Sequence, residues 1–264
     1  MHSAALVALA ILLATSGARA ADQPPMIRAR MAYNAADYDL AIAAAAEAGL
    51  EAGLADVASL VLSRALLERY RQGANPSDFA TAREVLRGVD RGHLVSRDRV
   101  DLLIGLGQAL YLDNAFGAAA EIFEPVLNGP TLLGQAERTR LLDWWAGALD
   151  REAHTHPADR RAPLYERIVR LMEQELRQNP GSPSGNYWLA AALRGSGDLD
   201  RAWDAAAAGW VRVTVGADVD ETRAYLNRLV IEVLVPERAR LRPSPDEASA
   251  ALRAEWETLT SQWP

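Results

Sequence analysis

Two stretches of the chain, residues 100–127 and 183–210, carry small and apolar residues at the same internal spacing. Gly107 precedes Ala119 in the first stretch by the same interval that separates Ala190 from Ala202 in the second. Apolar residues recur at helical spacing before each of these intervals, and a polar break at Asp113-Asn114 divides the first stretch. Each stretch therefore predicts two helices joined by a short turn, with small residues where the helices approach each other most closely.

The first stretch also fits the spacing of a known repeat without a gap. The matching positions are Leu103, Leu106, Gly107, Leu110, Ala119 and Phe123, with leucine at 103 and 110 where the motif has tryptophan and tyrosine. The chain resembles a tetratricopeptide repeat (TPR-like) protein of the bacterial exported type. The resemblance implies an all-α fold, a TPR-like α-solenoid of stacked antiparallel helical hairpins. It implies an architecture and leaves the chemistry open.

Further helices are expected on both sides of these two stretches. Their approximate ranges are 37–48, 57–72, 76–89, 141–149, 164–176 and 219–234, the last broken near Pro236. Ser77 or Asp78 is the expected cap of the third of these helices, after a polar loop at 73–76. A final helix over 245–262 carries an apolar stripe on one side, formed by Ala248, Leu252, Trp256, Leu259 and Trp263. We expect it to be a C-terminal capping helix.

The N-terminus has the layout of a cleavable secretory signal. An apolar run from Ala4 to Ala14 is followed by the small-residue site Ala18-Arg19-Ala20, which predicts a signal peptide over 1–20. The run spans about 11 residues, whereas a bilayer requires about 20. The alternative is a buried N-terminal helix. No later segment is apolar enough to be an integral membrane segment, so we expect residues 21–264 to form a single TPR-like helical repeat domain, periplasmic or secreted.

Composition excludes several classes of function. The chain has no cysteine, which rules out disulfides, thiol catalysis and cysteine-ligated zinc. Its net charge of −7 disfavours a nucleic-acid partner, because such a surface must displace phosphate counterions with a basic face. All basic residues other than histidine are arginine, and with the excess of alanine this suggests a GC-rich bacterial genome.

No residue pattern marks a catalytic, cofactor or metal site. His154-Thr155-His156, with Asp159 nearby, lacks the helical His-Glu-x-x-His arrangement and is interpreted as a solvated loop. Pro183 occupies the serine position of an apparent nucleophile elbow at 181–185, and Gly105-Leu106-Gly107 lacks the third glycine of a dinucleotide site. The chain is therefore predicted not to be an enzyme, with no cofactor and no metal.

The resemblance implies that first-helix residues line a groove for a protein or peptide partner. The corresponding positions here are Asp101, Ile104, Gln108, Tyr111, Arg140, Asp143, Trp144, Tyr187, Ala191 and Arg194. An alternative is that Trp144 and Tyr187 only pack between repeats. The expected function is an exported non-catalytic scaffold or adaptor. The alternatives are a small-ligand or glycan-binding protein that uses the paired aromatic residues, or an enzyme with a site near the 154–161 loop.

Overall fold

The computed structural model describes residues 23–130, 132–216 and 218–264, and every regular element in them is a helix. The predicted signal peptide, residues 1–20, lies outside the described residues. The chain divides into two compact units, the first ending at Ala115 and the second beginning at Phe116. The all-α class is thus confirmed for the described residues.

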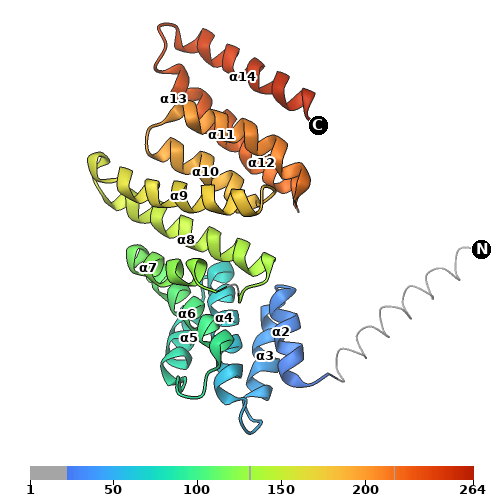
Figure 1. The fold of residues 1–264 in the computed structure, drawn as a ribbon. Coiled ribbons are helices and arrows are strands. Elements are labelled where there is room, and N and C mark those ends of the chain that lie inside the picture. The colour runs from blue at the N-terminus through green and yellow to red at the C-terminus, as the bar shows by residue number, and fades with distance from the viewer. Residues whose placement is uncertain (1–22, 131, 217) are drawn as a thin grey trace, which may run out of the picture. The chain divides into compact units, whose positions relative to one another are not determined.

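The first unit contains five described helices, which pack against their neighbours in the chain (Figure 1). They are α2 (Pro25–Asn34), α3 (Tyr38–Ala48), α4 (Ala55–Gly73), α5 (Pro76–Gly88) and α6 (Ser96–Leu112). Small side chains allow α2, α3 and α4 to approach closely, since the alanines of α2 and α3 are buried at Ala29, Ala32, Ala41, Ala44, Ala45 and Ala48. Leucines from α4, α5 and α6 form a second cluster beside them.

Helix starts in this unit differ in two places from the sequence prediction. Asn75 caps α5, since its Oδ1 accepts a hydrogen bond from the Ser77 amide at 3.2 Å. Ser77 or Asp78 was the expected cap, but Pro76 is preorganised for the first helical position and moves the cap to the residue before it. Helix α6 begins at Ser96, before the start of the 100–127 stretch in which the sequence predicts it.

The second unit contains the remaining helices, which also pack in neighbouring pairs (Figure 1). They are α7 (Phe116–Asn128), α8 (Gln135–Thr155), α9 (Ala162–Gln178), α10 (Pro183–Gly195), α11 (Leu199–Arg212), α12 (Val219–Leu229), α13 (Val235–Ala239) and α14 (Pro245–Gln262). Helix α10 contacts α8, α9, α11 and α12.

One predicted hairpin lies within the second unit, whereas the two helices of the other are assigned to different units. The second is present as α10 and α11, and its small residues Ala190 and Ala202 are both fully buried, as the spacing predicts. Both helices of the first hairpin are also present, but α6 belongs to the first unit and α7 to the second.

The C-terminal region does not break where the sequence suggests. Helix α12 continues through a π-helical turn, Val230–Leu234, into α13, whose second residue is Pro236. Proline lacks an amide hydrogen and its ring crowds the carbonyl four residues earlier, so a locally wider turn lets the helical path continue.

Helix α14 packs on α13 and α11. Trp256 is 1% exposed and lies edge-on to Trp203 and Trp210, with ring centroids 5.9 and 5.7 Å away. Its Nε1 donates to Asn227 Oδ1 at 2.8 Å. The buried part of the predicted stripe is Leu252 and Trp256, whereas the Trp263 side chain is exposed. The capping role expected for this helix stays a prediction.

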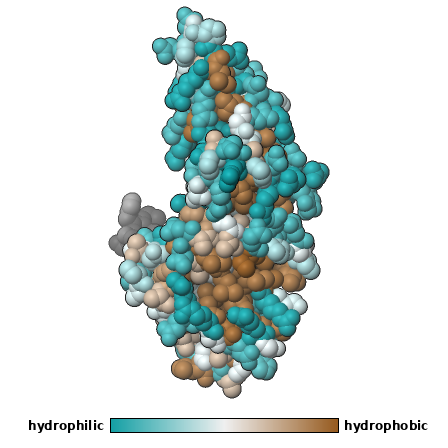
Figure 2. Space-filling model, turned by 90° about the vertical axis from the view of Figure 1, so that its left-hand side faces the viewer, coloured by the Kyte–Doolittle hydropathy of each residue, from teal (hydrophilic) through white to brown (hydrophobic). Residues whose placement is uncertain are grey.

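The surface is mixed in character. On the face drawn in Figure 2, hydrophilic residues surround separate apolar patches. None of the helices in the described part of the chain is both long enough and apolar enough to cross a membrane. Exposed apolar patches on a protein surface are candidates for partner contacts.

Candidate functional site

A pocket of about 480 Å³ lies within the second unit, between three helices that alternate along the chain. Helix α8 contributes Thr139, Arg140 and Asp143; α10 contributes Pro183, Ser184, Tyr187 and Trp188; and α12 with its N-cap contributes Asp218, Glu221, Thr222 and Tyr225. The volume falls within the range of roughly 300–1,000 Å³ that is usual for ligand pockets.

The local sequence explains why these side chains meet. On each helix the lining residues are separated by one, three or four positions, which places them on a single face. Helix α10 contacts both α8 and α12, so the three faces converge around it. Ser184 ties two of the helices together, because its hydroxyl donates to the Thr139 carbonyl at 3.1 Å.

Aromatic rings form one part of the pocket. Tyr187 lies edge-on to Trp188 and to Tyr225, with ring centroids 5.3 and 6.1 Å apart. Both outer rings are held by carboxylates: Trp188 Nε1 donates to Asp143 Oδ1 at 3.0 Å, and the Tyr225 hydroxyl donates to Glu221 Oε1 at 3.1 Å. The rings are therefore oriented by hydrogen bonds as well as by packing.

The pKa of the Asp143 carboxyl is raised by its place in the pocket. Its side chain keeps accessible surface, yet the surrounding protein replaces enough water to raise its pKa above the usual value. The hydrogen bond from Trp188 opposes this shift in pKa, and the negative charge of Glu221 adds to it.

Nearby carboxylates also raise the pKa values of the two tyrosines in the pocket. Burial is the main cause that raises the pKa of Tyr187, and the charges of Asp150 and Asp143 contribute. The pKa of Tyr225 is raised chiefly because its hydroxyl donates to Glu221. Arg228 lowers both pKa values, but more weakly.

Three of the predicted groove residues in this unit, Arg140, Asp143 and Tyr187, line the pocket. The other three do not: Trp144 and Ala191 are half-buried, and Arg194 is paired with Glu237, to which its Nε donates at 2.9 Å. Trp188 also lines the pocket but is not among the predicted groove residues.

Glu221 and Tyr225 were not anticipated at all. Their four-residue separation on α12 is an ordinary helical spacing. The two side chains line the pocket only because α12 packs beside α10.

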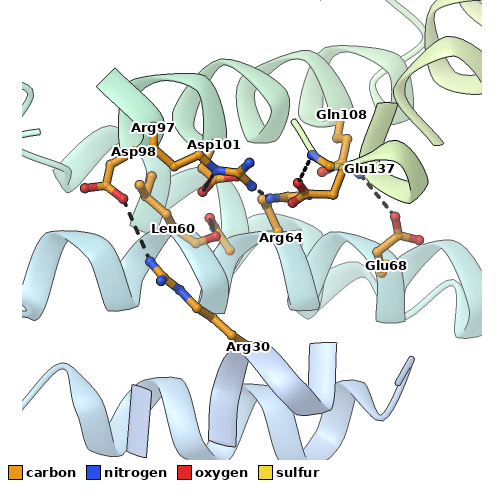
Figure 3. Close-up of polar contacts among 11 residues, drawn as sticks. Arg30, Leu60, Arg64, Glu68, Arg97, Asp98, Asp101, Gln108 and Glu137 are labelled. Carbon is orange, nitrogen blue, oxygen red and sulfur yellow. Dashed lines mark hydrogen bonds and ion pairs between the residues drawn. The ribbon is translucent and has the colours of Figure 1, made fainter. Parts of the chain in front are cut away.

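The four predicted groove residues of the first unit belong to a different arrangement, shown in part in Figure 3. Gln108 is 2% exposed and its Nε2 donates to Glu68 Oε1 at 3.1 Å, while Ile104 is 4% exposed. Asp101 Oδ1 accepts from Arg64 Nη1 at 2.7 Å, and Tyr111 is half-buried. Because α4 packs on α6, Asp101 and Gln108 tie these helices together.

The burial of Ile104 and Gln108 corrects the expectation that they line an open groove, since neither side chain presents surface to a partner.

Each histidine of the pair near the end of α8 contacts a residue one helical turn earlier. His154 Nδ1 lies 2.7 Å from the Asp150 carbonyl oxygen, and His156 Nε2 lies 3.1 Å from Glu152 Oε1. Within residues 23–130, 132–216 and 218–264, no group of three or more potential ligands from histidine, cysteine, aspartate and glutamate is placed to hold a metal ion. The pocket of the second unit, to which three of the predicted groove residues contribute, is taken as the candidate site.

Comparisons of the chain with protein-family models, with curated proteins and with solved structures gave no match.

Proposed function

We propose that this protein is an exported, non-catalytic scaffold or adaptor that binds a protein or peptide partner through a TPR-like array of helical hairpins. The observation that supports this proposal is the pocket itself, which three alternating helices, α8, α10 and α12, build from one face each. A surface assembled in this way suits an extended chain that follows successive helices.

The composition of the pocket fits noncovalent recognition. It combines Tyr187, Trp188 and Tyr225 with hydrogen-bonding groups on Asp143 and Glu221. Aromatic side chains with polar ends contribute a large share of binding energy at protein interfaces, because they bury much area and lose little conformational entropy.

Peptide selection tests this proposal directly. Peptides selected from a random display library on residues 21–264 are synthesised, and their dissociation constants are measured by fluorescence anisotropy. Tyr225 is 47% exposed, so Tyr225→Ala leaves the fold intact. We expect it to weaken binding about tenfold or more, as the loss of an interface aromatic does.

The matched control is Trp263→Ala, which removes another exposed aromatic side chain of the same unit outside the pocket. Its affinity should equal that of the native protein. Selected peptides that bind native protein and Tyr225→Ala equally well would show that the pocket is not the binding surface.

Export is a separate part of the proposal and rests on the sequence pattern at 4–20. Mass spectrometry of the protein recovered from the cell envelope or medium should give a chain that begins at Ala21. A recovered chain that retains residues 1–20 argues against a cleaved signal.

A further inference from the structure

We infer that the pocket between α8, α10 and α12 receives an arginine side chain of the partner peptide. The inference rests on the proposed function, since it names the chemistry that this same site recognises. Three features of the pocket support it: its aromatic rings, its carboxylates without cationic partners, and the placement of a ring beside an acid, which suits a flat, charged guanidinium group.

The rings provide the first argument. The edge-to-face contacts of Tyr187 with Trp188 and Tyr225 gather three π systems at one site, and Tyr225 remains about half exposed. A cation over the face of a tyrosine or tryptophan is attracted by the quadrupole of the ring. The protein uses this contact within the same unit, where the Arg223 guanidinium lies 4.7 Å from the centroid of the Trp210 ring.

The carboxylates provide the second argument. Asp143, Asp218 and Glu221 line the pocket, and in the part of the chain that the structure describes no ion pair joins any of them to an arginine. The side chains of Asp143, Asp218 and Glu221 are all exposed, so their charges are accessible to a partner from outside. The pocket therefore has charge that an external cation would complement.

Arg140 also lines the pocket and offsets part of this charge. Beyond the lining residues, Asp150 and Arg228 are close enough to influence the tyrosines, and their effects oppose each other. Three carboxylates against one lining arginine still leave the site acidic, so a cationic occupant is favoured over a neutral or anionic one.

The shape of the site favours arginine over lysine. Trp188 and Tyr225 are each hydrogen-bonded to a carboxylate, so ring and acid lie side by side at two points around Tyr187. A guanidinium is planar and can stack on a ring while its edge donates two parallel hydrogen bonds to a carboxylate. An ammonium group offers a point charge and no planar face.

Nuclear magnetic resonance titration tests the inference with defined probes. The probes are the capped tripeptide acetyl-Gly-Arg-Gly-amide, its lysine counterpart, and its citrulline counterpart, which has nearly the same shape as arginine but no charge. The reporter is the Trp188 indole N–H resonance, assigned as the one lost in Trp188→Phe, because this group contacts Asp143. We expect the arginine probe to bind roughly tenfold more tightly than the citrulline probe, with lysine between them.

Two variants that each remove one negative charge test whether the arginine probe binds at the pocket carboxylates. Asp143→Asn and Glu221→Gln keep the shape and the acceptor oxygen of each side chain, so the ring contacts survive, and each should weaken binding of the arginine probe several-fold. Asp204→Asn and Glu257→Gln are the matched controls, because both are exposed residues of the same unit outside the pocket and remove the same charge. Neither control should change the affinity.

Equal affinities for the arginine and citrulline probes, or no binding of the arginine probe, would overturn the inference. The proposal that the pocket binds peptides is tested separately by the display experiment. If selected peptides lack arginine but bind Tyr225→Ala more weakly than the native protein, the pocket binds peptides without recognising arginine. A neutral oligosaccharide that shifts the Trp188 resonance when the arginine probe does not would instead identify a glycan site.

Discussion

Gly195, the last residue of α10, allows the ring of Tyr165 to lie against the helix. A Cβ atom at position 195 would lie only 2.4 Å from two ring carbons of Tyr165. The ring cannot readily move away, because Tyr165 is 2% exposed and its hydroxyl donates to Asp150 Oδ1 at 3.1 Å. Replacing Gly195 by alanine therefore forces either the ring or the helix to shift.

Whether Gly195→Ala raises or lowers the free energy of unfolding shows whether the Tyr165 ring crowds this position. Alanine is favoured over glycine in a helix by up to about 1 kcal/mol, so an uncrowded site would be stabilised or unchanged. Overpacking a well-filled site costs about 1–3 kcal/mol. Since the contact distance is far below the van der Waals limit, we expect the overpacking to exceed the propensity gain, and Gly195→Ala to lower the free energy of unfolding by roughly 1–2 kcal/mol.

Urea denaturation provides the measurement. All seven tryptophans lie at or beyond residue 144, so their fluorescence follows the second unit, while far-ultraviolet circular dichroism follows both units. Gly88 is also the last residue of its helix, and a Cβ there meets no atom within 4 Å, so Gly88→Ala is the control and should be neutral or slightly stabilising.

A double variant gives a further check. Tyr165→Leu removes the crowded ring, so adding Gly195→Ala to it should cost less than Gly195→Ala does in the native protein. The reasoning is refuted if Gly195→Ala is as stable as the native protein, or if its cost is the same with and without the tyrosine ring.

Three further predictions concern packing and charge in the second unit. Ala202→Leu places three extra carbons at a fully buried position of the α10–α11 pair and should lower stability by about 1–3 kcal/mol, whereas an unchanged melting temperature would contradict the close approach. Trp256→Ala removes the ring that contacts Trp203 and Trp210 and should cost about 3–5 kcal/mol in urea denaturation, with Trp256→Phe costing less; equal costs would show that the indole is not specifically packed. The folded-state pKa of Asp143 is raised by burial, so its contribution to stability falls as pH rises from its usual pKa of about 3.9 through the raised value. Asp143→Asn should therefore gain stability relative to the native protein as pH increases over this window, and a difference that does not change with pH would argue against the raised pKa.

Much of the helical pattern could be predicted because it depends on local chemistry. The final helix begins at Pro245 and ends at Gln262, as its sequence pattern predicts, since proline is suited to the first helical turn. The α10–α11 pair was likewise anticipated from the placement of Ala190 and Ala202. The cap at Asn75 and the π-helical turn before Pro236 were missed, although proline is the local cause of both.

The site was only partly predictable. Position within a first helix selected Arg140, Asp143 and Tyr187, which line the pocket, but the same rule also selected Ile104 and Gln108, which are buried. Position along a helix identifies a face, and only the neighbouring helices determine whether that face is covered.

The sequence by itself determined that this chain is helical and where most of its helices lie, because helical periodicity, prolines and small residues act over a few positions. Only the tertiary structure decided which faces meet. Tyr225 and Glu221 line the pocket because α12 packs against α10, whereas in the first unit Gln108 is buried and donates to Glu68, forty residues away in the chain. Contacts of that separation depend on the packing of whole helices, which no local pattern encodes.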